Sequence, residues 1–392
     1  MTTHKERVLM ALNHEQPDRN PADLGGRQTT LSILAYESLK RHLGLTHLPT
    51  RVMAHTWQTA YIDEEVLEAF DIDTRHIRPA SRVNDEIGKT LAAPESDGTF
   101  VDEWGVTRSV VGDYANLLGH PLREATLADL DSFPWPDPAD NYDFKALRKP
   151  AKKLYEEGKY ALVGCLGSPG NIFEQAWYLR GLQEFMTDLI TEKEFAHALM
   201  RKVLDVRKRN VELYLHEVGE FIDVVQLADD LAGKDNLLIS PKTYREMVKP
   251  YQLELCRHVR GLTKAKIYYH SCGSISPLID ELIDNGVEIL NPVQVSAANM
   301  DTAELKKRFG RNLSFWGAVD TYDVLPNGTP RDVEAEVRRR ITDLGTGGGY
   351  VMAPVHNICA DVSPENIVAM YRTSRAFNTA DPVVATAAGE HV

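Results

Sequence analysis

Short apolar segments that alternate with amphipathic helical patterns restrict the fold of this chain more than any other feature. After residue 155 these segments lie at 160–165, 224–228, 267–269, 288–291, 313–317 and 350–353. Each has the length of a buried strand, and strands that alternate with helices of about 10–15 residues form parallel sheets. The alternation therefore predicts an α/β fold with a parallel central sheet.

The intervals between the apolar segments carry helix signals. Residues 182–215 are predicted to form two helices, and 241–260 a further one with proline in its first turn. Other helices are predicted at 276–285, 301–309 and 330–344. Two more strand candidates, at 22–24 and 74–77, would complete a TIM-type (β/α)8 barrel, and an open doubly wound sheet is the alternative.

Residues from about 80 to about 150 break this alternation. Hairpin-forming residues near 104–106 and 110–111 and a proline-rich turn at 134–138 replace the helical pattern. We interpret the segment as an early insertion over the barrel mouth, within a single domain of residues 1–378. The last residues, 379–392, are predicted to be a flexible tail.

Charge and composition exclude several classes of protein. The formal net charge of −13 argues against binding to nucleic acid or to an anionic membrane, since both depend on Lys and Arg pairing with phosphates. The N-terminus lacks the apolar core of a signal peptide, and no run of about 18 apolar residues occurs. A cytoplasmic protein is expected. Four cysteines in 392 residues do not resemble a disulfide framework, so thiols or metal ligands are the favoured interpretation.

His270 and Cys272, which follow the apolar segment 267–269, are the first candidates for a metal site. Side chains two residues apart on a strand face the same side, so imidazole and thiolate would converge, and Gly273 would let the chain turn away. His356 and Cys359 follow the segment 350–353 and could supply the third ligand. We favour His356 because it lies nearer the strand end, with Cys359 as the alternative. Nitrogen and sulfur ligands are typical of zinc, and three protein ligands leave one position open for catalysis.

Carboxylates at other strand ends extend this predicted site, because the functional groups of TIM-type barrels collect at the C-terminal ends of strands. Asp229 and Asp230 follow the segment 224–228. We expect one of them to contact substrate or metal, and the alternative is that both cap the next helix. Glu174 is a candidate catalytic acid or base, and the alternative is an ion pair with Arg180 on one helix face.

A set of short motifs is spread along the chain. They are Arg7-Val8-Leu9 with Gln16-Pro17-Asp18-Arg19, Ala228-Asp229-Asp230-Leu231, Ser240-Pro241 with Tyr244 and Lys249-Pro250-Tyr251, His270-Ser271-Cys272-Gly273, Asn291-Pro292-Val293-Gln294, Phe315-Trp316-Gly317 with Asp320, and Ala353-Pro354 with Pro364-Glu365-Asn366. Through them the chain resembles the uroporphyrinogen decarboxylase superfamily over nearly its full length, and in particular its zinc-dependent, corrinoid-linked methyltransferases.

The metal motif separates the branches of this superfamily. In methyltransferases that make methylated thiols, zinc is held by a His-x-Cys pair and a distant Cys after an Ala-Pro strand end. Here the pair matches His270 and Cys272, but the residue that matches the distant Cys is His356. This difference resembles methyltransferases that act on methyl ethers such as methoxylated aromatics. True decarboxylases need no metal, and their arginine-rich N-terminal motif is reduced here to Arg27.

The resemblance implies a zinc-dependent O-demethylase methyltransferase. It would pass the methyl group of a small O-methyl donor to the cobalt of a corrinoid (cobalamin) carried by a separate protein, with Asp230 and Glu174 as the catalytic candidates. The candidates for substrate binding are Arg27, Asp229 and the aromatic residues Trp57, Tyr61, Trp177 and Trp316. The alternatives are a methylcorrinoid-to-thiol methyltransferase, a metal-free uroporphyrinogen-type decarboxylase and a relative whose zinc has four protein ligands and is only structural.

Overall fold

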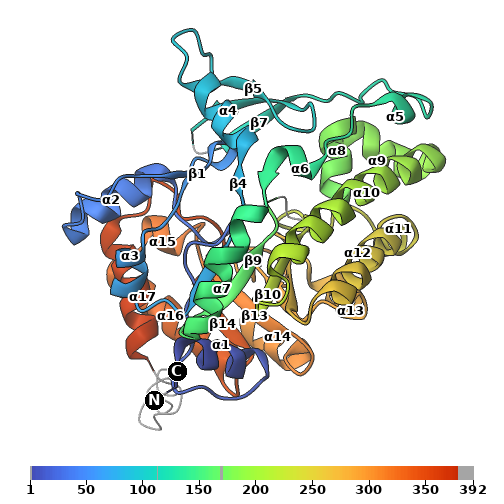
Figure 1. The fold of residues 1–392 in the computed structure, drawn as a ribbon. Helices are drawn as coiled ribbons and strands as arrows, with labels where there is room; N and C mark the ends of the chain where they lie inside the picture. Colours follow the sequence, from blue (N-terminus) through green and yellow to red (C-terminus); the bar gives the residue numbers. More distant parts are fainter. Residues whose placement is uncertain (1, 113, 168–170, 378–392) are drawn as a thin grey trace.

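A parallel sheet forms the centre of the computed structural model, which describes residues 2–112, 114–167 and 171–377 (Figure 1). Seven strands are hydrogen-bonded in the order β14-β13-β12-β11-β10-β9-β3, and every pairing between them is parallel. Their bounds are β3 (Thr74–Ile77), β9 (Ala161–Cys165), β10 (Val224–Ala228), β11 (Lys266–His270), β12 (Ile289–Asn291), β13 (Ser314–Val319) and β14 (Tyr350–Pro354). The strand candidates from the sequence therefore lie in one sheet.

Residues 21–23 connect the two edge strands of this sheet. Ala22 forms a parallel bridge with Met352 of β14, and its carbonyl oxygen accepts a hydrogen bond from the N–H of Asp73, directly before β3. The sheet thus curls into a TIM-type α/β barrel and is not an open doubly wound sheet. The predicted strand at 22–24 is reduced to this single bridge.

Asp23 holds the closing segment in place. Its fully buried carboxylate accepts hydrogen bonds from Thr29 Oγ1 (2.6 Å), Thr74 Oγ1 (2.5 Å), His76 Nε2 (2.7 Å) and Trp316 Nε1 (2.9 Å). Burial opposes a charge on His76, but the adjacent Asp23 carboxylate outweighs it and raises the pKa of His76 to about 10. A buried ion pair therefore ties the closing segment to β3.

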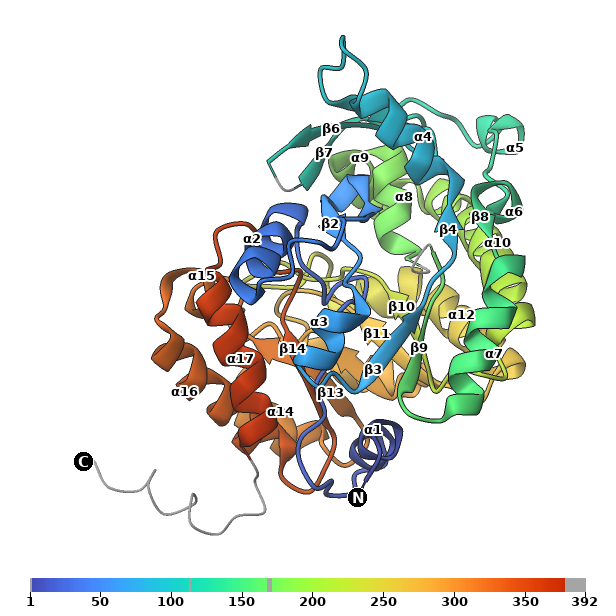
Figure 2. The ribbon, with the colours of Figure 1, turned by 60° about the vertical axis from the view of Figure 1, so that its left-hand side comes forward.

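Apolar side chains fill the inside of the barrel, and α1 (His4–Leu12) closes its N-terminal end (Figures 1 and 2). Val8 and Leu12 of α1 pack against inward-facing strand residues. These strand residues are Ala161, Val163, Val224, Tyr268, Ile289, Trp316, Val351 and Ala353. Because this end of the barrel is filled, a site for a ligand has to lie at the opposite end, where the strands terminate.

Helices cover the outside of the sheet. They are α2 (Ile33–Leu43), α3 (Glu64–Ala69), α7 (Arg148–Glu157), α8 (Phe173–Arg180), α9 (Leu182–Thr191), α10 (Lys193–Val218), α11 (Pro241–Thr243), α12 (Lys249–Leu262), α13 (Ile279–Asp284), α14 (Thr302–Phe309), α15 (Val324–Asn327), α16 (Pro330–Arg340) and α17 (Pro364–Ala376). None of the helices in the described residues combines the length and the apolar composition needed to cross a membrane.

The helix predicted over 241–260 is interrupted. A π-helical turn, Tyr244–Val248, separates α11 from α12, which has Pro250 in its first turn. Proline has no N–H to donate to the preceding helical turn, and the wider π turn accommodates the missing hydrogen bond. A second π turn, Ile341–Gly345, ends the helix predicted over 330–344.

The segment between β3 and β9 departs from the βα pattern, as the sequence suggested. It contains β4 (Ala80–Ser81), α4 (Arg82–Leu91), α5 (Asp129–Ser132), α6 (Pro138–Asn141), β8 (Tyr142–Asp143) and a three-stranded antiparallel sheet of β5 (Thr99–Val101), β6 (Thr107–Val111) and β7 (Tyr114–Gly119). This small sheet and α4 lie at the end of the barrel opposite α1 (Figures 1 and 2). A short antiparallel pair, β1 (Val52–Ala54) and β2 (Thr59–Ala60), precedes it in sequence. The tail predicted at 379–392 lies outside the described residues.

Candidate metal centre

His270 is the last residue of β11, and its orientation is fixed by a neighbouring strand. The residue lies in register with Ala228 of β10 and Asn291 of β12. Its Nδ1 is 2.5 Å from Asn291 Oδ1, and Asn291 Nδ2 donates to the carbonyl oxygen of Trp316 at 2.9 Å. Because the amide oxygen can only accept, the proton of His270 is on Nδ1, which leaves Nε2 as the free ligand atom.

Cys272 lies on the turn that follows β11. Its Sγ is 3.3 Å from His270 Nε2, and its N–H donates to Asp230 Oδ1 at 2.8 Å. Gly273 makes this turn possible, because its φ is +87° and a Cβ there would lie 2.4 Å from the carbonyl oxygen of Gly233. The turn therefore brings the thiol beside the imidazole, as the sequence predicted.

His356 completes the cluster from the loop after β14. One ligand atom from each of His270, Cys272 and His356 lies within 4.8 Å of the other two. The loop is held by backbone hydrogen bonds from Val355 to Val319 and from Ile358 to Thr30, both 2.9 Å long. Among the described residues Cys359 is not part of this cluster, and its thiol lies 3.6 Å from the carbonyl oxygen of Asn357.

The protonation of the cluster suits a metal ion. Burial lowers the pKa of His270 to about 4 and that of His356 to about 3, so both imidazoles are neutral at pH 7. Burial and the nearby Asp230 carboxylate raise the pKa of the Cys272 thiol. Two neutral imidazoles and one thiol that ionises on metal binding are a donor set typical of zinc, and the 3.3 Å between Sγ and Nε2 matches the spacing of about 3.5 Å between ligand atoms of a tetrahedral zinc. The residues present therefore fit this ion.

Two carboxylates lie beside the cluster. Asp230 Oδ1 is 3.9 Å from His270 Nε2. Glu174 accepts hydrogen bonds from Asn171 Nδ2 (3.0 Å) and from the hydroxyl of Tyr178. Burial raises the pKa of Asp230 to about 6, and burial together with the Asp230 carboxylate raises the pKa of Glu174 to about 7. A carboxyl group with a pKa near 7 can donate or accept a proton at physiological pH.

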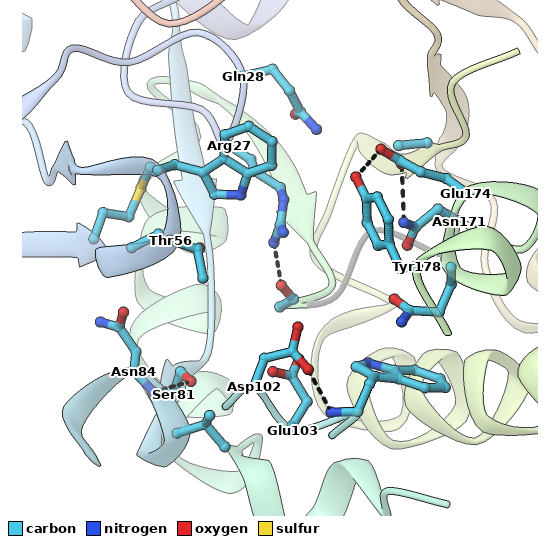
Figure 3. A pocket seen from close by; sticks show the side chains of 18 of the residues that line it. Arg27, Gln28, Thr56, Ser81, Asn84, Asp102, Glu103, Asn171, Glu174 and Tyr178 are labelled. Atoms are coloured by element: carbon cyan, nitrogen blue, oxygen red, sulfur yellow. Dashed lines mark hydrogen bonds between the residues drawn. The ribbon is translucent and has the colours of Figure 1, made fainter. Parts of the chain in front are cut away.

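The cluster opens into a cavity of about 150 Å³ at the mouth of the barrel (Figure 3). Arg27, Trp57, Glu174 and Asp230 line it, together with His270 and His356. The Trp57 ring centroid is 6.2 Å from that of His356. Figure 3 shows Arg27 extending into the cavity opposite Glu174 and Tyr178. The structure therefore brings together the metal-ligand, catalytic and two of the substrate-binding candidates.

Asp229 lies elsewhere and has a structural contact. Its side chain is fully buried and accepts hydrogen bonds from the N–H groups of Ile172, Phe173 and Glu174 and from Gln252 Nε2, at 2.8–3.0 Å. The carboxylate thus caps the start of α8, the helix that carries Glu174, and does not line the cavity. The structure therefore favours the alternative prediction for Asp229, a helix cap, over a direct contact with substrate.

Three predicted pocket aromatics do not line the cavity either. Trp316 is fully buried inside the barrel, where its Nε1 donates to Asp23. Trp177 packs against the core and the Tyr178 ring, with centroids 4.3 Å apart. The Arg51 guanidinium lies over the Tyr61 ring, 5.6 Å from the centroid of that ring. Aromatic side chains bury large apolar areas, and these three rings do so against the core or, for Tyr61, against the Arg51 side chain.

Comparison with known proteins agrees with this fold. The sequence pattern described as "Uroporphyrinogen decarboxylase (URO-D)" matches residues 111–377. The chain belongs to the uroporphyrinogen decarboxylase family. A uroporphyrinogen decarboxylase from Methylobacillus flagellatus is 28% identical over 233 residues, 57% of this chain and 61% of the relative. A methylated-thiol–coenzyme M methyltransferase from Methanosarcina mazei is 27% identical over 219 residues, 54% of each chain.

This chain spans about three fifths of the length of the curated uroporphyrinogen decarboxylases that it matches. Among solved structures, a methyltransferase from Methanosarcina mazei aligns with a TM-score of 0.62 at 19% identity, covering 96% of this chain and 99% of that chain. This similarity shows a shared fold.

The sequence alone did not predict a role at this site for three residues. Asn291 orients His270, Tyr178 bonds Glu174, and Arg78 lines the cavity directly after β3. Each had a signal: Asn291 ends an apolar strand, Tyr178 follows Glu174 by one helical turn, and Arg78 follows a predicted strand.

Proposed function

We propose that the protein is a zinc-dependent methyltransferase that transfers a methyl group from a small O-methyl donor to the cobalt of a corrinoid on a separate protein. The observation that carries this proposal is the convergence of His270, Cys272 and His356 at the barrel mouth, beside two carboxyl groups with raised pKa values. The relative that is named as a methylated-thiol–coenzyme M methyltransferase supports a methyltransferase within this family.

The three ligand residues and the carboxyl groups have separate roles in this proposal. Zinc held by His270, Cys272 and His356 would supply Lewis-acid stabilisation of the negative charge that develops on the ether oxygen as the methyl group leaves. Asn291 orients His270 through Nδ1, and Asp230 holds the turn that carries Cys272. These contacts fix the ligand atoms before the metal binds.

Glu174 is the proposed proton donor. In this step the electron pair of Co(I) forms the bond to the methyl carbon and the carbon–oxygen bond breaks with its pair on the oxygen. The oxygen then takes the proton of the Glu174 carboxyl group, and the cobalt becomes methyl-Co(III). Burial and the neighbouring Asp230 carboxylate raise its pKa, so this group can hold a proton at neutral pH. Tyr178 and Asn171 fix its position by hydrogen bonds. Transfer by direct displacement requires the acceptor to approach from the side opposite the oxygen, so the partner protein has to reach the barrel mouth.

A uroporphyrinogen-type decarboxylase is the second candidate, because several relatives carry that name. The convergence of His270, Cys272 and His356 supports the methyltransferase instead, since a metal-free decarboxylase would have no use for three metal-ligand side chains. Transfer from a methylcorrinoid to a thiol would use the same metal site with the thiol as the acceptor.

The test measures zinc and methyl transfer on the purified full chain. We expect about one zinc per chain in wild type and in the control Cys359→Ala, and loss of zinc in His270→Ala and His356→Ala. Zinc-loaded protein should convert cob(I)alamin to methylcob(III)alamin with a methoxylated aromatic donor, which is followed by absorbance. A wild-type protein without zinc after purification with added zinc would refute the proposal, and release of carbon dioxide from uroporphyrinogen would then support the decarboxylase.

A further inference from the structure

Two arginines lie at the barrel mouth on the wall that faces the metal-ligand cluster. His270 is the last residue of β11 and His356 follows β14, with β12 and β13 between these two strands. Across the barrel from this interval lie β3 and β9, next to the closing segment 21–23. Arg78 follows β3 directly, and Arg27 follows the closing segment, and both line the cavity.

The hydrogen bonds of the cavity arginines differ. Arg108 pairs with Asp102 at 2.7 Å, and Arg207 donates to Asn171 and Gln175. Arg27 donates to the carbonyl oxygen of Gly167. In contrast, Nη1 of Arg78 is buried without a hydrogen-bond partner among the described residues. A buried N–H group without a partner costs free energy, and an acceptor supplied by a ligand would relieve that cost.

The charges nearby leave this wall positive. Asp102 is already paired with Arg108, and burial and Asp102 together raise the pKa of Glu103, which opposes its ionisation. Burial and the positive charge of Arg78 both lower the pKa of Arg27. Two guanidinium groups that repel each other in a confined space are stabilised by an anion between them.

We propose that Arg78, together with Arg27, binds a carboxylate of the methyl donor, so that the donor is a small methoxylated carboxylic acid. The carboxylate would lie against β3 and the methoxy group against the cluster on the opposite wall. That the anion belongs to a methyl donor rests on the proposed function; that the cavity binds a carboxylate does not. Donors with a quaternary ammonium group are disfavoured by the same two positive charges.

The experiment compares an anion with its neutral isostere by isothermal titration calorimetry on the zinc-loaded full chain. The probes are 3-methoxybenzoate and 3-methoxybenzamide. The variants are Arg78→Gln, the conservative Arg78→Lys, and the control Arg82→Gln, which removes an exposed arginine four residues along the chain. Circular dichroism reports whether each variant is folded.

We expect wild type to bind the benzoate about 10- to 100-fold more tightly than the benzamide, as a charged hydrogen-bonded contact requires. Arg78→Gln should remove this preference without changing the affinity for the benzamide, Arg78→Lys should keep part of it, and Arg82→Gln should keep all of it. Equal affinities of the two probes for wild type would overturn the inference without any variant, and so would an unchanged preference in folded Arg78→Gln.

The outcomes separate this inference from the proposed function. If the benzoate is preferred through Arg78 but its methyl group never reaches cob(I)alamin, the carboxylate site stands and the methyltransferase proposal fails. If both probes bind equally and both transfer their methyl groups, the methyltransferase proposal stands and the carboxylate site is refuted.

Discussion

Replacement of Asn291 by alanine tests how the candidate metal centre is held. Asn291 is fully buried, accepts from His270 Nδ1 at 2.5 Å and donates to the carbonyl oxygen of Trp316 at 2.9 Å. Asn291→Ala leaves both of these buried groups without a partner. At about 1–3 kcal/mol for each group, the free energy of unfolding should fall by about 2–6 kcal/mol.

The effect on the metal is separate from the effect on stability. Without Asn291 the His270 ring can rotate or change its tautomer, so Nε2 is no longer directed at the metal. Loss of such an orienting contact weakens metal binding by about 10- to 100-fold, or about 1.4–2.7 kcal/mol. Asn291→Asp keeps an acceptor oxygen for Nδ1 and should bind zinc within a few-fold of wild type.

Competition for zinc with a chromophoric chelator at pH 7 measures this affinity, and urea denaturation of the metal-free protein measures stability. The matched control is Asn285→Ala, because Asn285 is also buried and donates to the Tyr244 hydroxyl at 3.1 Å, away from the site. It should lose stability and keep its zinc affinity. If Asn291→Ala also keeps the zinc affinity of its folded fraction, the assignment of His270 Nε2 as an oriented ligand is refuted.

Two further predictions concern buried ionisable groups. Asp229→Ala removes the acceptor of four hydrogen bonds at the start of α8 and should lower the free energy of unfolding by about 3–5 kcal/mol in urea denaturation. The control Asp235→Ala changes an exposed residue and should alter the free energy of unfolding by less than about 0.5 kcal/mol. Equal effects of the two substitutions would contradict the capping role. His76 has a folded pKa of about 10 against about 6.5 in the unfolded chain, so the stability that its charge provides is complete below pH 6.5 and is lost as the pH rises through 10. Between pH 7 and 9 the free energy of unfolding of wild type should fall by up to about 1.4 kcal/mol per pH unit more than that of His76→Gln, and parallel pH profiles would show that the pair is not charged.

Strand periodicity predicted much of the site, because the ends of parallel strands in a barrel meet at one mouth. The pair His270 and Cys272 and the distant His356 could be proposed from their positions after apolar segments, and the structure brings their ligand atoms together. The same rule could not separate Asp229 from Asp230. Adjacent residues point in different directions, and only the position of α8 decides that Asp229 caps that helix.

Aromatic residues were harder to assign. An inward-facing strand residue can lie deep in the barrel or at its mouth, and the alternation of a strand is the same in both cases. Trp316 lies deep, in a layer with Tyr268 and Val351. The contribution of Arg78 also depends on tertiary structure, since only the folded chain shows which guanidinium groups already have partners.

The two walls of the cavity come from different parts of the chain. The candidate ligands and Asn291 come from residues 270–356, whereas Arg27, Arg78 and the residues around Asp102 come from the first third of the chain. Recombination or mutation in the early segment can therefore alter what the cavity accepts while the cluster stays intact. For an engineer, this separation suggests chimaeras that exchange residues 78–108 between relatives and leave the candidate metal ligands in place.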